Sequence, residues 1–214
     1  MAATKRIANE GKASAPADES SARVRIVEGA RRHFFAHGFR GVTMDDLAAE
    51  LGMSKKTLYA HFSSKSALLE AVIEAKLRSA DAEFGEVTTN FPPNFLDALH
   101  QLLACVRRQS EELQPAFTRD MAREAPDLFQ IVQVKRRALI QRHFGKLIGE
   151  GRKTGMIRKD IPADLMIEIL VGATDALVNP VKLSQLNLSA KAGLTAIVTI
   201  FLEGVLTGKG RSKS

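Results

Sequence analysis

Five side chains that can bind an anion or donate a hydrogen bond lie within seven residues of the chain. They are Lys55, Lys56, Thr57, Tyr59 and His61. Ammonium groups attract phosphate, and hydroxyl or ring N–H groups can donate to phosphate oxygens or to the edges of bases. Taken singly, each is equally consistent with a solvated surface, and His61 beside Phe62 is consistent with a packing role.

The stretch around these residues predicts two helices joined by a glycine turn. Thr43 and Asp46 have the spacing of a capping box, which starts a helix. Its inward face would carry side chains at i, i+3, i+4 and i+7, namely Met44, Leu47, Ala48 and Leu51. Gly52 suits the turn, Ser54 caps a short second helix, and Leu58 and Phe62 face inward. This is the layout of a helix-turn-helix, which places a short helix in a DNA major groove.

Two further helices flank this pair. We expect the first over Ser21–His37, where Ile26, Ala30 and Phe34 repeat every four residues and Gly38 supplies a left-handed end. The helix after the pair begins at Ser64, with Leu68, Leu69, Val72 and Ile73 as its apolar stripe. The helix starts at Thr43 and at Lys65 present free amides and a positive dipole end, which favour a phosphate.

The stretch from about Ala22 to Leu77 resembles the DNA-binding domain of the TetR family of bacterial transcriptional regulators. The segment that carries the resemblance is GFRGVTMDDLAAELGMSKKTLYAHFSSKSALLEAV, with Ala30 and Phe34 before it. The resemblance implies backbone contacts from Thr43, Tyr59 and Lys65 and groove-facing roles for Lys55, Lys56 and Thr57. Lys56 departs from the small residue of many members, so its target, a base or a phosphate, stays open. His61 completes the predicted DNA-binding set.

Composition agrees with a globular protein and leaves the partner open. The chain has 214 residues, a formal net charge of +7 and 45% hydrophobic residues. A basic chain suits a polyanion, but many enzymes are basic too. The single cysteine, Cys105, excludes an internal disulfide, and no apolar run has the roughly 20 residues that a membrane span needs. We therefore expect a cytoplasmic protein with no membrane partner.

The rest of the chain predicts helices throughout and no strand. Residues 84–93 break the helical pattern and predict a connector. Asn94, Pro115 and Asp127 mark later helix starts, Gly155 ends the long helix that starts at Asp127, and Pro162 suits the first residue of the next. The expected fold is all-α: a three-helix helix-turn-helix domain followed by a helical ligand-binding and dimerisation domain. The expected boundaries are a disordered tail (1–20), the helix-turn-helix domain (21–66), a connecting helix (67–83), the second domain (84–208) and a basic tail (209–214).

The last two predicted helices are apolar on more than one face. They are the segments LMIEILVGATDAL (165–177) and AKAGLTAIVTIFLEGVL (190–206). Such helices must be buried on two sides, either in the core of a monomer or against a second subunit. The resemblance favours a twofold dimer built as a four-helix bundle. The predicted interface residues are Leu165, Ile169, Ala173, Leu177, Leu194, Val198, Phe201 and Leu202.

Members of this family commonly bind a small molecule in the second domain, and binding weakens their affinity for DNA. The apolar candidates here are Leu99, Phe117, Met121, Phe129 and Phe144, with His100 and Asp175 as polar members. Phe95, Cys105, Arg123 and Asn179 are further candidates. Every apolar candidate is also consistent with plain core. The 11 Phe and 6 Met residues favour a small apolar or aromatic effector.

No catalytic set emerges from the sequence. The five histidines show no metal-ligand spacing, and no glycine-rich phosphate loop is present. We expect no enzyme activity, no metal and no cofactor. The leading hypothesis is a dimeric, ligand-responsive regulator, favoured as a repressor over an activator, that binds a near-palindromic DNA operator. The alternative is a small-molecule-binding or scaffold protein of the same helical fold that does not bind an operator.

Overall fold

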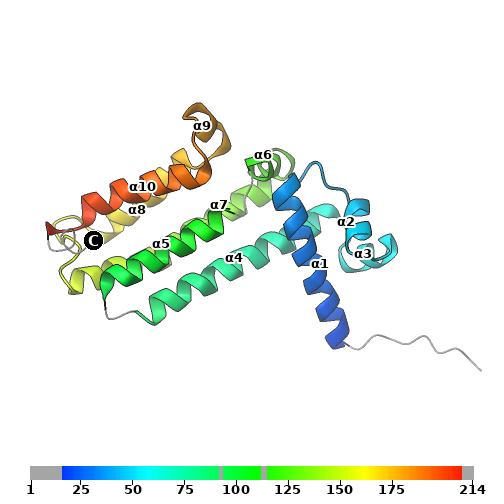
Figure 1. Cartoon of the computed structure of the whole chain (residues 1–214), viewed down its shortest axis with the longest axis horizontal. Helices are drawn as coiled ribbons and strands as arrows, with labels where there is room; N and C mark the ends of the chain where they lie inside the picture. The colour runs from blue at the N-terminus through cyan, green and yellow to red at the C-terminus, as the bar shows by residue number, and fades with distance from the viewer. Residues whose placement is uncertain (1–15, 92–93, 112–114, 209–214) are drawn as a thin grey trace, which may run out of the picture.

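The computed structural model describes residues 16–91, 94–111 and 115–208, and these ranges fold into helices joined by short turns (Figure 1). The helices are, in chain order, α1 (Pro16–His37), α2 (Met44–Glu50), α3 (Lys55–His61), α4 (Lys65–Thr89), α5 (Phe95–Glu111), α6 (Pro115–Glu124), α7 (Pro126–Lys153), α8 (Ala163–Leu177), α9 (Pro180–Gln185) and α10 (Ala190–Val205). The β-type pairing in these ranges is an isolated bridge between Ile157 and Leu206. The expected all-α fold is confirmed.

The N-terminal unit, residues 16–73, packs α1, α2, α3 and the start of α4 around one apolar core. Its fully buried side chains include Ile26, Phe34, Leu47, Leu58 and Leu68. These are the residues that the helical periodicity placed inward, because a stripe every three to four residues can be covered on one side. The edge of the Phe34 ring meets Phe39, with the ring centroids 5.4 Å apart.

The predicted N-caps and glycine turns in this unit are confirmed. Thr43, Ser54 and Ser64 each accept a hydrogen bond from the backbone amide three residues on, which satisfies one free donor at each helix start. Gly38 and Gly52 have φ values of 80° and 62° in the left-handed region, where a side chain would be strained. The caps and these two turns set the directions of α1, α2 and α3.

Two predicted boundaries are wrong. Helix α1 begins at Pro16, so residues 16–20 are helical, although we expected them to belong to a disordered tail. The other tail residues, 1–15 and 209–214, lie outside the described residues. Helix α4 continues to Thr89 through most of the predicted connector. Phe84, Val87 and Thr88 are buried against the second domain, and this packing outweighs the weak helix propensity of the surrounding Gly and Thr residues.

The second domain forms layers beyond α4. Helices α5 and α7 pack on α4, and α8 and α10 pack on α5 and α7 (Figure 1). Buried Leu99, Leu102, Phe144, Leu147 and Leu170 belong to its core. Helix α4 runs from the N-terminal unit along the length of this domain, so it belongs to both.

The short helix α9 was not predicted. Asn179 caps it by accepting a hydrogen bond from the amide of Lys182 at 2.9 Å, and Pro180 occupies its first turn. An Asn-Pro pair is a recognised helix start, so the sequence did carry the signal.

Candidate nucleic-acid interface

The inner face of helix α3 packs on the N-terminal core, and its outer face is exposed to solvent. Leu58 and the following Phe62 are buried, with 0% and 2% of their surfaces exposed. In contrast, Lys55, Lys56, Thr57 and Tyr59 are exposed, and Tyr59 keeps 48% of its surface accessible. Buried side chains fix the helix, and hydrogen-bond donors on its opposite face are exposed. This is the arrangement that a helix needs to contact bases in a DNA groove.

The turn between α2 and α3 fixes the angle between these helices. The amide of Gly52 donates to the carbonyl of Ala49 at 3.1 Å, and the amide of Met53 donates to the carbonyl of Ala48 at 3.0 Å. These bonds use carbonyls at the end of α2 that would otherwise lack partners. The position of α3 is therefore set by backbone bonds as well as by its buried side chains.

The two lysines at the start of α3 are in different electrostatic states. The Lys55 ammonium lies 2.5 Å from the carboxylate of Asp45 on α2, and both side chains are largely exposed. Lys56 is exposed and forms no ion pair within the described ranges. An exposed pair such as Lys55–Asp45 is worth little in water, so DNA phosphates can compete for the lysine. Lys56 can bind a phosphate without first breaking an ion pair within the described ranges.

The helix starts at Thr43 and Lys65 differ as anion sites. The backbone amide and the hydroxyl of Thr43 both donate to one carboxylate oxygen of Asp46, at 2.9 and 2.7 Å. The hydrogen bond from the Thr43 hydroxyl is the main cause that holds the pKa of Asp46 below its ordinary value. Asp45 adds a second negative charge there, whereas the first turn of α4 contains no acidic residue. The start of α4 is thus the better phosphate site.

Lys65 stands at that start in a partly buried position. Its ammonium lies 4.3 Å from the centre of the Phe39 ring. Burial is the main cause that lowers the pKa of Lys65, while the carboxylates of Asp120 and Glu124 oppose this shift. The charge is therefore held against the N-terminal unit rather than on a freely moving side chain.

Arg23 is a positioning residue that the sequence did not reveal. From α1, its guanidinium donates to the carbonyl of His61 at 3.1 Å and lies 4.2 Å from the centre of the Phe62 ring. These contacts tie the C-terminal end of α3 to α1. Its partners are 38 and 39 residues away in the chain, and nothing in the pattern of α1 identifies them.

Helix α6 packs on the N-terminal unit and, with the start of α7, brings three of the predicted pocket residues there. Phe117 and Met121 are buried in the core of that unit, and Phe129 packs against it. The ring centroids of Phe117 and Phe35 are 4.8 Å apart. The carboxylate of Asp120 also accepts a hydrogen bond from the amide of Arg40 at 3.0 Å. The structure thus places these three apolar residues against the N-terminal unit, and their role in a ligand pocket stays a prediction.

The remaining pocket candidates divide between the second core and the surface. Leu99 and Phe144 lie in the second core, while His100 and Asp175 are exposed, and Asp175 pairs with Arg136 at 2.5 Å. The two described cavities hold about 230 and 220 Å³, and neither is lined by any predicted ligand residue. One is a groove between α4 and α7, and the other lies beside Arg23 and His61.

Polar atoms that sequence reasoning missed lie inside the second domain. Gln109 Oε1, Gln133 Oε1 and Arg136 Nε are buried and have no hydrogen-bond partner within the described part of the chain. Buried polar atoms without partners are costly, so each such atom needs an explanation, such as a bound water, an ion or a ligand. Cys105 is also buried there, and burial is the main cause that raises its thiol pKa to about 11. It is therefore a poor nucleophile.

The outer faces of α8 and α10 are apolar and open. Leu165 and Ile169 of α8 are about half exposed, at 50% and 54%, and Ile200 of α10 is 72% exposed. Ile200 was missed by the sequence prediction, whereas Val198 is buried inside the chain, so its predicted place at the interface is wrong. The other predicted interface residues are half-buried: Ala173, Leu177, Leu194, Phe201 and Leu202.

Two kinds of feature are absent from the described residues. Within these ranges, no cluster of three or more His, Cys, Asp and Glu side chains is arranged to bind a metal. In the same ranges, no helix combines the length and the apolar character that crossing a membrane requires.

Known proteins resemble the chain in sequence. The family model for bacterial regulatory proteins of the tetR family matches residues 26–72. An HTH-type transcriptional regulator of Staphylococcus aureus is 31% identical over 129 residues, which cover 53% of this chain and 70% of that protein. The HTH-type transcriptional repressor SCO4008 of Streptomyces coelicolor is 26% identical over 168 residues, which cover 76% of this chain and 82% of that protein.

Solved structures show the same fold at lower identity. SmeT, the repressor of the Stenotrophomonas maltophilia multidrug efflux pump SmeDEF, aligns with a TM-score of 0.63 at 16% identity, covering 89% of this chain and 93% of that one. A transcriptional regulator from Saccharomonospora viridis, solved in complex with choline, aligns with a TM-score of 0.68 at 20% identity, covering 88% of this chain and 99% of that one.

Proposed function

The chain belongs to the TetR family of bacterial transcriptional regulators, and from that premise we propose that it is a dimeric, ligand-responsive repressor of a near-palindromic operator. The observation that carries the proposal is the outer face of α3. Its donors are exposed, while Leu58 and Phe62 beneath them are buried and hold the helix in place. The function of the chain as a DNA-binding regulator follows from the family, and this face supplies the contact.

Each exposed residue of this face is assigned a contact. Lys56 and Thr57 face the major groove, and Tyr59 reaches a phosphate through its hydroxyl. Lys55 joins the groove contacts after it leaves Asp45, from which it is separated by 2.5 Å in the free protein. The start of α4, with Lys65, binds a phosphate through backbone amides. Thr43 makes a weaker contact because Asp46 already occupies its hydroxyl and its amide.

A second copy of the chain supplies the second DNA-binding helix. The open face of α8 and α10 carries Leu165, Ile169 and Ile200, and covering it with the same face of another copy removes apolar surface from water. Two α3 helices related by a twofold axis then read two half-sites. A dimer seated on an operator represses by occluding polymerase.

The effector is a small molecule that enters the second domain. We place it beside buried polar atoms to which the described part of the chain offers no hydrogen-bond partner: Gln133 Oε1 and Arg136 Nε on α7 and Gln109 Oε1 on α5. Apolar residues of the same core, Leu99 and Phe144 among them, would surround its apolar or aromatic body. Loss of operator binding on addition of one compound from a ligand screen supports this assignment, and a screen with no such compound counts against it.

The decisive experiment combines Lys55→Ala with Tyr59→Ala and measures binding to the DNA upstream of the protein's own gene. We expect the double variant to lose binding while its dimer persists in solution. Lys159→Ala is a matched control because it removes an exposed lysine after α7, far from α3 in the chain. Wild-type binding should weaken steeply with salt, because phosphate contacts release counterions. Wild-type protein that shows no salt-dependent binding to this DNA would refute the proposed function.

A further inference from the structure

A carboxylate from α6 reaches the turn that joins α1 to α2. Oδ2 of Asp120 accepts a hydrogen bond from the backbone amide of Arg40 at 3.0 Å, across 80 positions of the chain. Asp120 lies on the same face of α6 as Phe117 and Met121, which are buried in the N-terminal core, because residues three and four apart share a helix face. One face of α6 therefore brings both apolar packing and a fixed acceptor to this turn.

The turn has room for this carboxylate because residue 38 is a glycine. Gly38 ends α1 with a φ of 80°. A Cβ at this position would lie 2.6 Å from Oδ2 of Asp120, which is closer than two atoms that are not bonded can approach. The backbone conformation is one reason for the glycine, and the space that the Asp120 carboxylate occupies is a second.

The same turn lies against Lys65, the predicted phosphate contact at the start of α4. The ring of Phe39, the residue before Arg40, has the Lys65 ammonium 4.3 Å from its centre. Burial lowers the pKa of Lys65, and the carboxylates of Asp120 and Glu124 oppose this shift, so they help to keep the ammonium charged. The position of the turn thus determines where this charge stands beside the backbone amides of α4.

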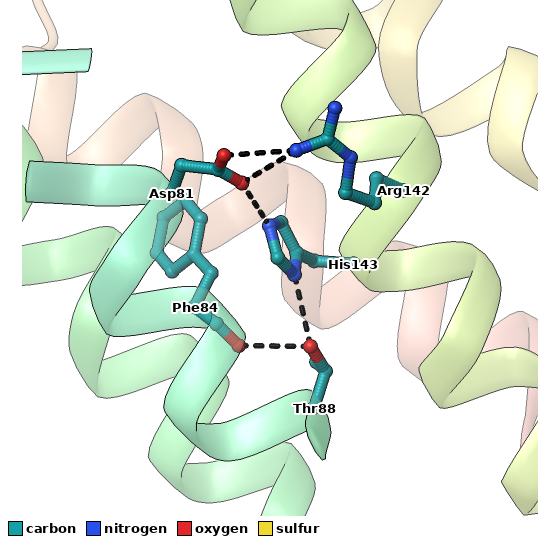
Figure 2. A network of polar contacts seen from close by, with 5 residues as sticks. All are labelled: Asp81, Phe84, Thr88, Arg142 and His143. Atoms are coloured by element: carbon teal, nitrogen blue, oxygen red, sulfur yellow. Dashed lines mark hydrogen bonds and ion pairs between the residues drawn. The ribbon is translucent and has the colours of Figure 1, made fainter. Parts of the chain in front are cut away.

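Helix α6 is itself held in place through α7. Ala125 alone separates these two helices, and α7 is fastened to α4 by a polar network (Figure 2). His143 of α7 lies 2.9 Å from the hydroxyl of Thr88 and 2.8 Å from Oδ1 of Asp81, both on α4, and Arg142 donates to both oxygens of the same carboxylate. These contacts fix the place of α6 relative to α4, the helix that starts beside the turn.

We propose that Asp120 is a positioning residue for DNA binding, whose carboxylate holds the turn between α1 and α2 where Lys65 and α3 can meet the operator. Helix α2 begins directly after this turn and packs against α3. The effect on operator affinity rests on the proposed function, whereas the bond to the turn does not. A negative charge by itself opposes DNA binding, so the sign of the change on removing Asp120 separates positioning from charge.

Amide exchange on the full chain tests the bond without DNA. NMR follows the exchange of the Arg40 amide with solvent in wild type and in Asp120→Ala. The variant should exchange this amide at least ten-fold faster, because the acceptor is lost. The amide of Leu47, which donates to the carbonyl of Thr43 at 3.2 Å, is the reference and should exchange alike in both. Equal exchange of the Arg40 amide in the two proteins would overturn the proposal.

Two glycine variants test the place of the carboxylate. Gly38→Ala and Gly52→Ala impose similar backbone strain, since φ is 80° and 62°. A Cβ at Gly52 meets no neighbouring atom of the described chain within 4 Å, whereas one at Gly38 meets Asp120. Gly38→Ala should therefore lower the urea midpoint of unfolding more than Gly52→Ala, and adding Asp120→Ala should reduce this excess. An excess that the double variant keeps in full would contradict the close approach of the carboxylate.

Affinity for the DNA upstream of the protein's own gene tests the last step, at a temperature where circular dichroism shows every variant folded. Asp120→Ala should bind about ten-fold more weakly than wild type, and its salt slope should fall by about one as the Lys65 contact is lost. Asp120→Asn keeps an oxygen for the Arg40 amide and should stay within about two-fold of wild type. Glu124→Ala, which removes an exposed carboxylate from the same helix, is the control and should leave affinity unchanged or raise it.

The outcomes separate this inference from the proposed function. If Asp120→Ala binds as tightly as wild type or more tightly, Asp120 does not position the DNA-binding surface. If Asp120→Asn is as weak as Asp120→Ala, the effect belongs to the charge and the positioning role fails. If wild-type protein does not bind this DNA, the proposed function fails, and the amide exchange still decides whether Asp120 holds the turn.

Discussion

The N-terminal unit and the second domain cover their apolar side chains to different extents. In the N-terminal unit, buried residues such as Phe34 and Leu58 are enclosed by α1 to α4, with α6 completing the cover. In the second domain, α8 and α10 leave Leu165, Ile169 and Ile200 at least half exposed. The first unit is complete within one chain, whereas the second domain offers a face that another chain can cover.

The difference extends to polar groups. The N-terminal unit keeps its donors on the surface, where Lys56 and Tyr59 are exposed. The second domain instead pairs polar groups across its helices, as where buried His143 of α7 meets half-exposed Asp81 of α4. Surface donors are suited to binding an external partner. Buried polar pairs specify how helices sit against one another, and they respond to whatever changes their charge or their partners.

The largest expected effect comes from opening the N-terminal core. Phe34→Ala removes a fully buried ring that packs on Phe39, and it should lower the free energy of unfolding by about 3–5 kcal/mol. Urea denaturation measures this. Tyr59→Ala removes a similar ring from an exposed position and should change stability by about 0.5 kcal/mol or less. Equal losses of unfolding free energy in the two variants would contradict a buried core under an exposed α3 face.

Next in size is the effect of a charge on the open face. Ile169→Glu places a carboxylate at the proposed interface, twice in a twofold dimer, and should weaken dimerisation by about 30-fold or more. Sedimentation at a series of concentrations gives the dissociation constant. Val24→Glu is the control, because Val24 of α1 is 59% exposed and lies outside this face. A dimer that tolerates Ile169→Glu as well as it tolerates Val24→Glu must use another surface.

A smaller effect is expected from Lys56→Ala, which removes a lysine of α3 that forms no ion pair within the described residues. Operator affinity should fall by about ten-fold, within the range for a single base or phosphate contact. Titrations at several salt concentrations separate the two targets. A phosphate contact lowers the salt slope by about one and weakens all sequences alike, whereas a base contact acts mainly on the operator. Unchanged affinity would remove Lys56 from the interface.

The smallest effect, and one of opposite sign, is expected from Asp45→Asn. This change frees Lys55 from its carboxylate partner and removes a negative charge near the phosphates. Affinity for non-operator DNA should rise by a few-fold, and the salt slope should steepen by about one. Glu150→Gln, which breaks the Lys153–Glu150 pair on α7, is the matched control. If the two variants have the same salt slope, Asp45 does not restrain Lys55.

Local patterns predicted most of the fold because its signals are short in range. Caps at Thr43, Ser54 and Ser64 and the stripes behind them depend on residues three to seven apart, so one sequence contains the whole signal. The end of α4 was misjudged because its last turns are stabilised by the second domain, which local propensity does not include. The DNA-contact residues predicted on α3 remain predictions, although their exposure agrees with that role.

The sequence also left open which core the predicted pocket residues join, and their role in a ligand pocket stays a prediction. Side-chain type indicates that Phe117 and Met121 are buried, but it does not indicate which core they join. Helix α6 docks on α1, so these residues complete the N-terminal unit. The choice between two cores depends on how the chain folds back over some 80 residues, as in the Asp120–Arg40 bond. No periodicity carries that information.

The sequence by itself determined the helices, the helix-turn-helix and the kinship with a family, because caps, turns and apolar stripes are local. The tertiary structure decided which lysine is free, since the Lys55 partner lies on another helix. It also decided which apolar residues remain exposed and that His143 meets Asp81 from 62 positions away. Contacts of this kind depend on how the helices pack, and packing is a property of the whole chain.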